Sequence, residues 1–179
     1  MSYTISKLIP EDELREGIKK VAEKINRDYG DQEVHLVCVL KGGVYFLTEL
    51  SKYLNMKVSI DFMSVSSYGS STVSSGVVKI IKDLDEPIKD KNVIVVEDIV
   101  DTGNTLSYLI SLLKDREPAS IKLCTMLDKP SRREKDIEAD YTAFTIPDKF
   151  VLGFGLDFDQ KYRNLPYIGV VEFLSLIHI

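Results

Sequence analysis

The residues with the clearest chemical potential lie in the stretch Val93–Leu106, with the sequence VIVVEDIVDTGNTL. An unbroken apolar run, typical of a strand covered on both faces of a parallel sheet, ends in Glu97 and Asp98. A hydroxyl-rich turn, Asp101–Thr105, follows and leads into apolar residues at helical spacing. We therefore expect Asp98 and the residues after it to lie beyond the carboxyl end of the strand, where open α/β sheets bind their ligands.

The turn from Thr102 to Thr105 has the composition of a phosphate-binding loop. Free backbone N–H groups and the dipole of the following helix favour an anion there, and Gly103 lets the backbone approach it closely. Three acids beside a phosphate would repel it unless ribose hydroxyls or Mg²⁺ lie between them. Each acid alone could merely end a strand or cap a helix. The ordered string of residues favours a functional site instead.

Length and composition restrict the remaining possibilities. With 179 residues and 44% hydrophobic content, residues 1–179 are predicted to form a single domain with a good-sized core. A formal net charge of −5 argues against non-specific binding to nucleic acid or to an anionic membrane. We see neither an apolar run of membrane-spanning length nor a signal peptide, and so expect a cytoplasmic protein. Cys38 and Cys124 lie in apolar runs and are predicted to be buried free thiols.

The predicted elements alternate between strands and helices, which indicates an α/β fold with a central parallel sheet flanked by helices. Pro10 is expected to open a helix that Gly30 ends. The serine-rich segment Ser64–Gly76 is expected to be a mobile loop or hairpin connection. The other expected elements are strands at Val34–Leu40, Lys57–Val65, Val77–Ile81, Val93–Glu97, Ile121–Leu127, Tyr141–Ile146, Phe150–Gly153 and Tyr167–Val171, and helices at Val44–Leu54 and Thr105–Lys114.

The sequence VIVVEDIVDTGNTL resembles the phosphoribosyl pyrophosphate (PRPP) motif of the type I phosphoribosyltransferases. The likeness runs from about the first strand to Gly169 and is greatest to the bacterial hypoxanthine (hypoxanthine-guanine) enzymes. It implies a small hood formed by N- and C-terminal segments, together with a flexible lid loop. It also implies Mg²⁺-dependent transfer of 5-phosphoribosyl from PRPP to N9 of a purine base. The expected assembly is a homodimer or homotetramer.

For the sugar-phosphate half of that reaction, the resemblance assigns a role to each residue of the motif. Glu97 and Asp98 would bind the ribose hydroxyls and Mg²⁺. Asp101 would be the catalytic residue, taking the proton from purine N7 as N9 attacks. Asn104 stands where some relatives carry lysine, so its amide could donate a hydrogen bond without adding charge. The residues that would hold the 5′-phosphate are Thr102, Gly103, Asn104 and Thr105.

A second strand end would bind pyrophosphate. The turn Lys41, Gly42 and Gly43 follows the strand Val34–Leu40. In the purine enzymes that the chain resembles, this turn holds pyrophosphate and its first peptide bond is often cis, a bond that here joins Leu40 to Lys41. The same likeness implies that Arg163 binds pyrophosphate directly and that Asp157 approaches a second Mg²⁺.

Three further residues would form the purine half of the site. Lys129 would donate a hydrogen bond to the 6-oxo group, which favours hypoxanthine or guanine over adenine. Phe150 would stack on the ring, and Val151 would pair its main-chain groups with the base edge. Arg132, close to Lys129 in sequence, is interpreted as ordinary solvated surface.

The lid of the resembled family would here include Ser67 and Tyr68, and its closure would exclude water during bond breaking. Two other interpretations stay open. One is a PRPP-sensing regulator of the same fold that has no turnover, and the other is a transferase for another base such as xanthine or a pyrimidine. The apolar tail after Val171 could add a strand or contact another subunit.

Overall fold

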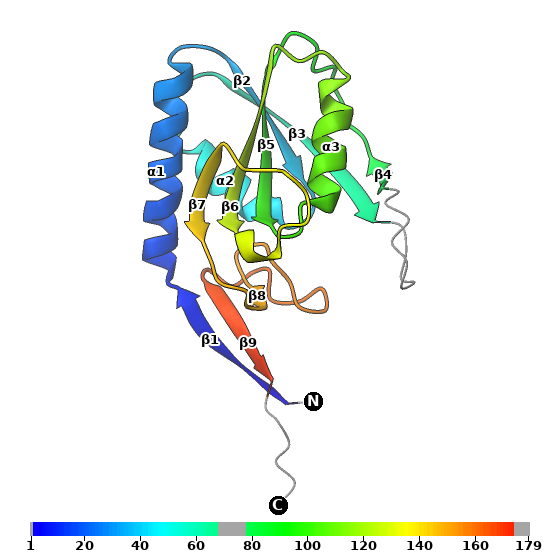
Figure 1. The fold of residues 1–179 in the computed structure, drawn as a ribbon. Helices are drawn as coiled ribbons and strands as arrows, with labels where there is room; N and C mark the ends of the chain where they lie inside the picture. The colour runs from blue at the N-terminus through cyan, green and yellow to red at the C-terminus, as the bar shows by residue number, and fades with distance from the viewer. Residues whose placement is uncertain (1, 68–77, 174–179) are drawn as a thin grey trace, which may run out of the picture.

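The computed structural model describes residues 2–67 and 78–173, which form a six-stranded and a three-stranded sheet (Figure 1). Within these ranges, no helix is long and apolar enough to cross a membrane. The elements in chain order are β1 (Tyr3–Ile9), α1 (Glu11–Tyr29), β2 (Val34–Val39), α2 (Gly43–Ser51), β3 (Val58–Ser67), β4 (Val78–Lys82), β5 (Asn92–Val100), α3 (Asn104–Lys114), β6 (Ser120–Asp128), the 3₁₀ turn η1 (Pro130–Arg132), β7 (Tyr141–Thr145), β8 (Val151–Leu152) and β9 (Ile168–Phe173).

The larger sheet confirms the predicted parallel architecture. Its strand order is β4-β3-β2-β5-β6-β7, and each neighbouring pair is parallel except β3 with β4. All six residues of β2 are buried, because α1 and α2 cover one face of the sheet and α3 covers the other (Figure 1). Cys38 and Cys124 are buried free thiols, as predicted, and burial raises the pKa of both.

The formation of helix α1 is explained by the spacing of its apolar residues. Leu14, Ile18, Val21 and Ile25 lie on one face and are buried against the sheet. Acidic residues occupy the first turn, where their negative charges interact favourably with the positive end of the helix dipole. The helix ends at Gly30, whose φ of 56° is a conformation that glycine adopts without a steric penalty.

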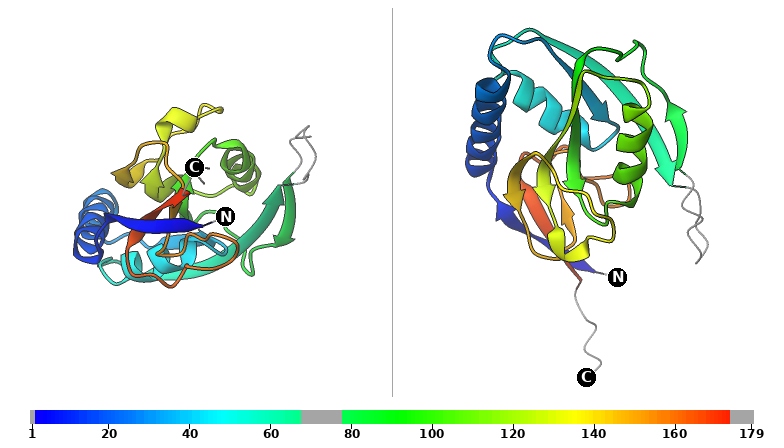
Figure 2. Two further views of the ribbon diagram at one scale, coloured as in Figure 1. Left: turned by 90° about the horizontal axis from the view of Figure 1, so that it is seen from below. Right: turned by 45° about the horizontal axis from the view of Figure 1, so that its top comes forward.

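The second sheet is the expected hood, built from the two ends of the described chain. Strand β1 pairs antiparallel with β9, and β9 pairs antiparallel with β8. Figure 2 shows the hood from below, lying across the end of the larger sheet at which the parallel strands finish. Strand β1 has no separate signal in the element pattern, because its partner lies more than 160 residues away, with Tyr3 opposite Phe173.

Two predicted boundaries near the site were wrong, and α2 also ends earlier than predicted, at Ser51 and not at Leu54. Strand β5 runs to Val100 through its pairing with β6, so Asp98 lies within its last half and not beyond it. Ser64–Ser67 belong to β3 and not to a loop, because they pair with β4. Tyr68 and the rest of the expected lid, up to Gly76, lie outside the described residues, as does Val77, and the apolar tail is described only to Phe173.

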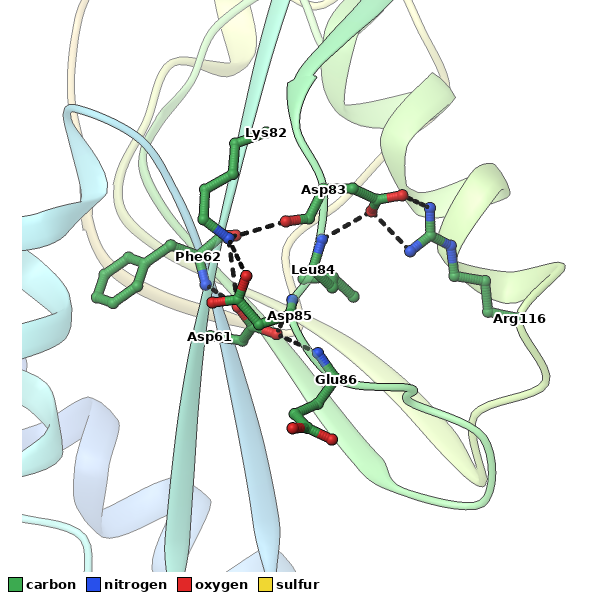
Figure 3. A network of polar contacts seen from close by, with 8 residues as sticks. All are labelled: Asp61, Phe62, Lys82, Asp83, Leu84, Asp85, Glu86 and Arg116. Atoms are coloured by element: carbon green, nitrogen blue, oxygen red, sulfur yellow. Dashed lines mark hydrogen bonds and ion pairs between the residues drawn. The ribbon is translucent and has the colours of Figure 1, made fainter.

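A polar network fastens the segment that follows β4 (Figure 3). The buried Asp61 carboxylate accepts hydrogen bonds from the backbone N–H groups of Asp85 and Glu86, at 2.8 and 3.2 Å. Burial alone would raise the pKa of Asp61, but these bonds, that of its neighbouring N–H group and the Lys82 ammonium hold the pKa below its usual value. Arg116 donates two hydrogen bonds to Asp83. The segment is thus tied both to β3 and to the end of α3.

Candidate active site

Glu97 and Asp98 place two adjacent carboxyl groups in β5. Burial raises the pKa of Glu97 well above its usual value, and the neighbouring Asp98 charge raises it further. Burial also raises the pKa of Asp98 to about 6, although a hydrogen bond from the Ile99 N–H group and the positive charge of Arg163 lower it. The Oε2 atom of Glu97 is buried without a partner in the described structure. Such a pair suits a ligand that supplies positive charge or hydroxyl donors.

The residues present fit Mg²⁺ on that ground, although Asp157, expected to approach a second Mg²⁺, is paired otherwise. Among residues 2–67 and 78–173, no three His, Cys, Asp or Glu side chains gather closely enough to hold a metal ion. Asp157 lies instead 2.8 Å from Arg163. Mg²⁺ is commonly bound by one or two carboxylates together with substrate phosphates and water, so Glu97 and Asp98 would hold it jointly with the substrate.

The turn between β5 and α3 has the geometry of a phosphate loop. Gly103 has a φ of 81°, and α3 begins at Asn104, so the turn leads directly into the first N–H groups of the helix, which have no partner within the helix. The side chain of Asn104 does not extend into the loop, because its Nδ2 atom donates a hydrogen bond to Glu134 at 2.7 Å. The Thr102 carbonyl accepts hydrogen bonds from two backbone N–H groups of the segment after β6.

Asp101 lies among three basic side chains from that same segment. The Nζ atom of Lys129 is 3.8 Å from Asp101 Oδ2, and the Nε atom of Arg132 is 3.5 Å from Asp101 Oδ1. Arg133 donates a hydrogen bond to the Asp101 carbonyl at 2.6 Å and also pairs with Asp128. Arg132 is exposed, as interpreted from the sequence, but its guanidinium also contacts the proposed catalytic carboxylate.

Lys129 lies beside the loop that leads into Phe150. The ammonium of Lys129 is buried and donates one hydrogen bond, at 2.9 Å, to the carbonyl of Lys149. The next residue, Phe150, exposes half of its surface, and its ring meets Phe158 edge to face at 5.6 Å between centroids. An ammonium with donors to spare thus lies 3.8 Å from Asp101, and the carbonyl that it bonds belongs to the residue before a partly exposed aromatic ring.

The main chain of Val151 is directed toward the free edge of the hood. The carbonyl of Phe150 accepts a hydrogen bond from the N–H group of Val171 in β9. Because successive strand residues direct their polar groups to opposite sides, those of Val151 point away from β9. Strand β8 is the edge strand of its sheet, so these groups can pair with a ligand.

The turn after β2 lies directly against the acidic pair. The predicted cis peptide bond between Leu40 and Lys41 is present. A Cβ atom at Gly42 would lie 1.6 Å from Asp98 Oδ2, and one at Gly155 would lie 2.0 Å from the carbonyl oxygen of Gly42. The turn, β5 and the loop after β8 therefore meet with backbone atoms in close approach.

Arg163 and Lys41 converge on Gln160, a residue without a recognisable sequence signal. Gln160 Oε1 accepts hydrogen bonds at 3.3 Å from both Lys41 Nζ and Arg163 Nη2. Arg163 also donates to the carbonyl of Gly155 at 2.7 Å and pairs with Asp157. Both cations expected to bind pyrophosphate thus contact the same side-chain oxygen. Sequence reasoning also missed Arg133 and Glu134, whose contacts with the phosphate loop arise only from the fold.

Comparisons with known proteins agree with this arrangement. The model of the phosphoribosyl transferase domain matches residues 10–159. A hypoxanthine-guanine phosphoribosyltransferase of Bacillus subtilis is 48% identical over 173 residues, which cover 96% of each chain. The bifunctional protein TilS/HprT of Listeria monocytogenes is 50% identical over 165 residues, 92% of this chain and 26% of its own length. The chain thus spans about a quarter of that longer relative.

A solved structure gives the same result. The crystal structure of a hypoxanthine-guanine phosphoribosyltransferase from Bacillus anthracis, with a HEPES molecule in the active site, is 46% identical and has a TM-score of 0.90. The match covers 93% of this chain and 98% of that one. With the family model matching most of its length, the chain belongs to the phosphoribosyltransferase family.

Proposed function

We propose that the chain transfers the 5-phosphoribosyl group of PRPP to N9 of hypoxanthine or guanine, with Mg²⁺, to give IMP or GMP and pyrophosphate. The observation that carries the proposal is the approach of a carboxylate and an ammonium, Asp101 and Lys129, to 3.8 Å. A purine with a 6-oxo group presents a hydrogen-bond acceptor at the 6-position and an ionisable N–H group at N7. Lys129 and Asp101 match these two groups in chemical type.

Binding of PRPP, the phosphoribosyl donor, would use three parts of the site. Glu97 and Asp98 would accept hydrogen bonds from the ribose hydroxyls, which relieves their mutual repulsion. The loop 102–105 would hold the 5′-phosphate with backbone N–H groups and threonine hydroxyls. The pyrophosphate would replace Asp157 and Gln160 as the partner of Arg163 and Lys41. When bound, Mg²⁺ neutralises charge on the leaving pyrophosphate.

The chemical step follows from the placement of Asp101. N9 of the base forms a bond to C1′ of the ribose while the bond from C1′ to pyrophosphate oxygen breaks, and that electron pair leaves with pyrophosphate. The proton on N7 passes to Asp101. Positive charge develops on the sugar during the transfer, and a nearby carboxylate stabilises it.

Selection of the base would depend on Lys129, Phe150 and Val151. The Lys129 ammonium can donate to a 6-oxo group but not to the 6-amino group of adenine, which is itself a donor. Phe150 offers its exposed ring for stacking. Discrimination at the 2-position falls to main-chain groups such as those of Val151. These groups suit both hypoxanthine and guanine.

A panel of bases tests the proposal. The chain is incubated with PRPP and Mg²⁺ and with hypoxanthine, guanine, xanthine or adenine in turn, and the nucleotide product is measured. We expect IMP and GMP, with little XMP or AMP. PRPP binding without any nucleotide product would instead favour a regulator, and XMP as the main product would favour a xanthine enzyme. Cytoplasmic location and a homodimer or homotetramer stay predictions.

A further inference from the structure

Arg132 approaches the proposed catalytic carboxylate more closely than Lys129 does. Its Nε atom is 3.5 Å from Asp101 Oδ1, whereas Lys129 Nζ is 3.8 Å from Oδ2. The two cations therefore contact different oxygens of one carboxylate. Both also reach Asp148, with Lys129 Nζ 3.8 Å from Oδ1 and Arg132 Nη1 3.9 Å from Oδ2. Arg133, the remaining basic group beside Asp101, contacts its carbonyl and pairs with Asp128.

Arg132 faces the buried oxygen of Asp101, so the 40% exposure of the Asp101 side chain leaves Oδ2 as the oxygen open to a ligand. Asp101 Oδ1 is buried and has no hydrogen-bond partner within the described residues. The contact with Arg132 is an ion pair without hydrogen-bond geometry, and the arginine side chain is 51% exposed. A half-exposed ion pair of this kind is weak, so it can orient a carboxylate without abolishing its basicity.

We propose that Arg132 is a positioning residue for the proton transfer, holding Oδ1 of the Asp101 carboxylate so that Oδ2 faces purine N7. Lys129 would bind the 6-oxo group at the same time and so release Oδ2. Arg132 would then be the cation that remains on the carboxylate during reaction. The inference rests on the proposed function, because it takes Asp101 as the base that receives the N7 proton.

The test compares Arg132→Gln with the wild-type chain in single-turnover reactions, so that product release does not mask the chemical step. With hypoxanthine we expect the rate to fall about threefold, the scale of one half-exposed ion pair. The KM for PRPP should stay unchanged. With 8-azahypoxanthine, whose ring N–H group is more acidic and needs less help from a base, the loss should be smaller.

Two variants serve as controls. Arg132→Lys keeps the positive charge and should recover most of the rate with hypoxanthine. Lys57→Gln removes an exposed charge next to the start of β3, at the opposite end of the parallel strands, and should leave both rates unchanged. Equal losses with the two bases, or a normal rate in Arg132→Gln, would overturn the inference. Absence of IMP formation by the wild-type chain would instead refute the proposed function.

Discussion

The carboxylate of Asp98 fills the space that a side chain at Gly42 would need, since a Cβ atom there would lie 1.6 Å from Asp98 Oδ2. Gly42 has an ordinary right-handed conformation, with a φ of −61°, so the requirement for glycine comes from this close approach alone. The contact joins the turn proposed for pyrophosphate to the strand proposed for ribose. The two halves of PRPP would therefore bind to surfaces that touch each other.

Gly42→Ala should damage PRPP binding more than it damages the fold. The added methyl group has to displace the Asp98 carboxylate, so we expect the KM for PRPP to rise at least tenfold and the free energy of unfolding to fall by about 1–3 kcal/mol. Steady-state kinetics and urea unfolding measure the two effects. Gly30→Ala is the matched control, because nothing lies within 4 Å of its Cβ position, although its φ of 56° strains an alanine. It should lower stability by about 1 kcal/mol and leave the KM unchanged.

Asp98→Asn should stabilise the ligand-free chain while it abolishes most activity. The folded pKa of Asp98, about 6, lies above the unfolded value of about 3.9, so the folded state binds this proton more tightly. Stability therefore rises as the pH falls through about 6 toward 4. In thermal or urea unfolding, the wild type should gain about 1–2 kcal/mol between pH 7.5 and pH 5. The variant should show a smaller gain. An equal gain in both would contradict the assignment of this proton to Asp98.

Asp61→Asn should have the opposite dependence on pH. The folded pKa of Asp61 is held below its usual value, so its contribution is present above the unfolded pKa and is lost as the pH falls through the folded value. We expect Asp61→Asn to cost about 1–3 kcal/mol at pH 7, where the wild-type carboxylate accepts two loop N–H groups. The difference between the two chains should shrink below about pH 4, which urea unfolding at several pH values would measure. A difference in the free energy of unfolding that stayed constant with pH would contradict the assignment of this pH dependence to Asp61.

Asp101→Asn should lower kcat far more than it weakens PRPP binding. The amide keeps the size of the side chain but cannot take the N7 proton, so we expect a loss of about 10²-fold or more in kcat. The dissociation constant for PRPP, measured by calorimetry with Mg²⁺, should change by less than about threefold, since the residue binds the base and not the phosphates. Comparable losses in both quantities would refute the role as base.

Arg133→Lys should loosen the phosphate loop although it keeps the charge. The Arg133 guanidinium binds the Asp101 carbonyl and the Asp128 carboxylate at once, through two different nitrogens. A lysine ammonium has a single nitrogen and does not reproduce this pair of contacts. We expect the free energy of unfolding to fall by about 1–2 kcal/mol and the KM for PRPP to rise several-fold. Lys135→Arg, in the same segment, is a control that should leave both unchanged.

The elements that sequence patterns predicted well are those with local signals. Helix α1 has a continuous apolar face and a glycine at its end, β2 is apolar except for His35, and β5 contains the apolar run Val93–Val96. Strand β1 has no such signal, because only its pairing with β9 makes it a strand. The end of β5 was misplaced for a related reason, since the pairing of Val100 with Asp128 in β6 extends it past the acids.

The same distinction, between local sequence signals and contacts made by distant segments, applies to the site. The PRPP motif is one continuous string, so its acids and its glycine could be assigned from sequence. Gln160 joins Lys41 to Arg163 only because the loop after β8 folds back over the turn after β2. Arg132 could not be distinguished from solvated surface, because its contact with Asp101 depends on the distance between two strand ends.

The short segment after β6 has a consequence for attempts to redesign the choice of base. It begins with Lys129, and a few residues later its backbone holds the carbonyl of Thr102 while Glu134 holds the side chain of Asn104. An insertion or a library of substitutions placed between Lys129 and Glu134 would alter the binding of the sugar phosphate as well as the recognition of the purine 6-position. Altered selectivity is better sought in the hood around Val151, where the edge strand makes no such contact with the loop.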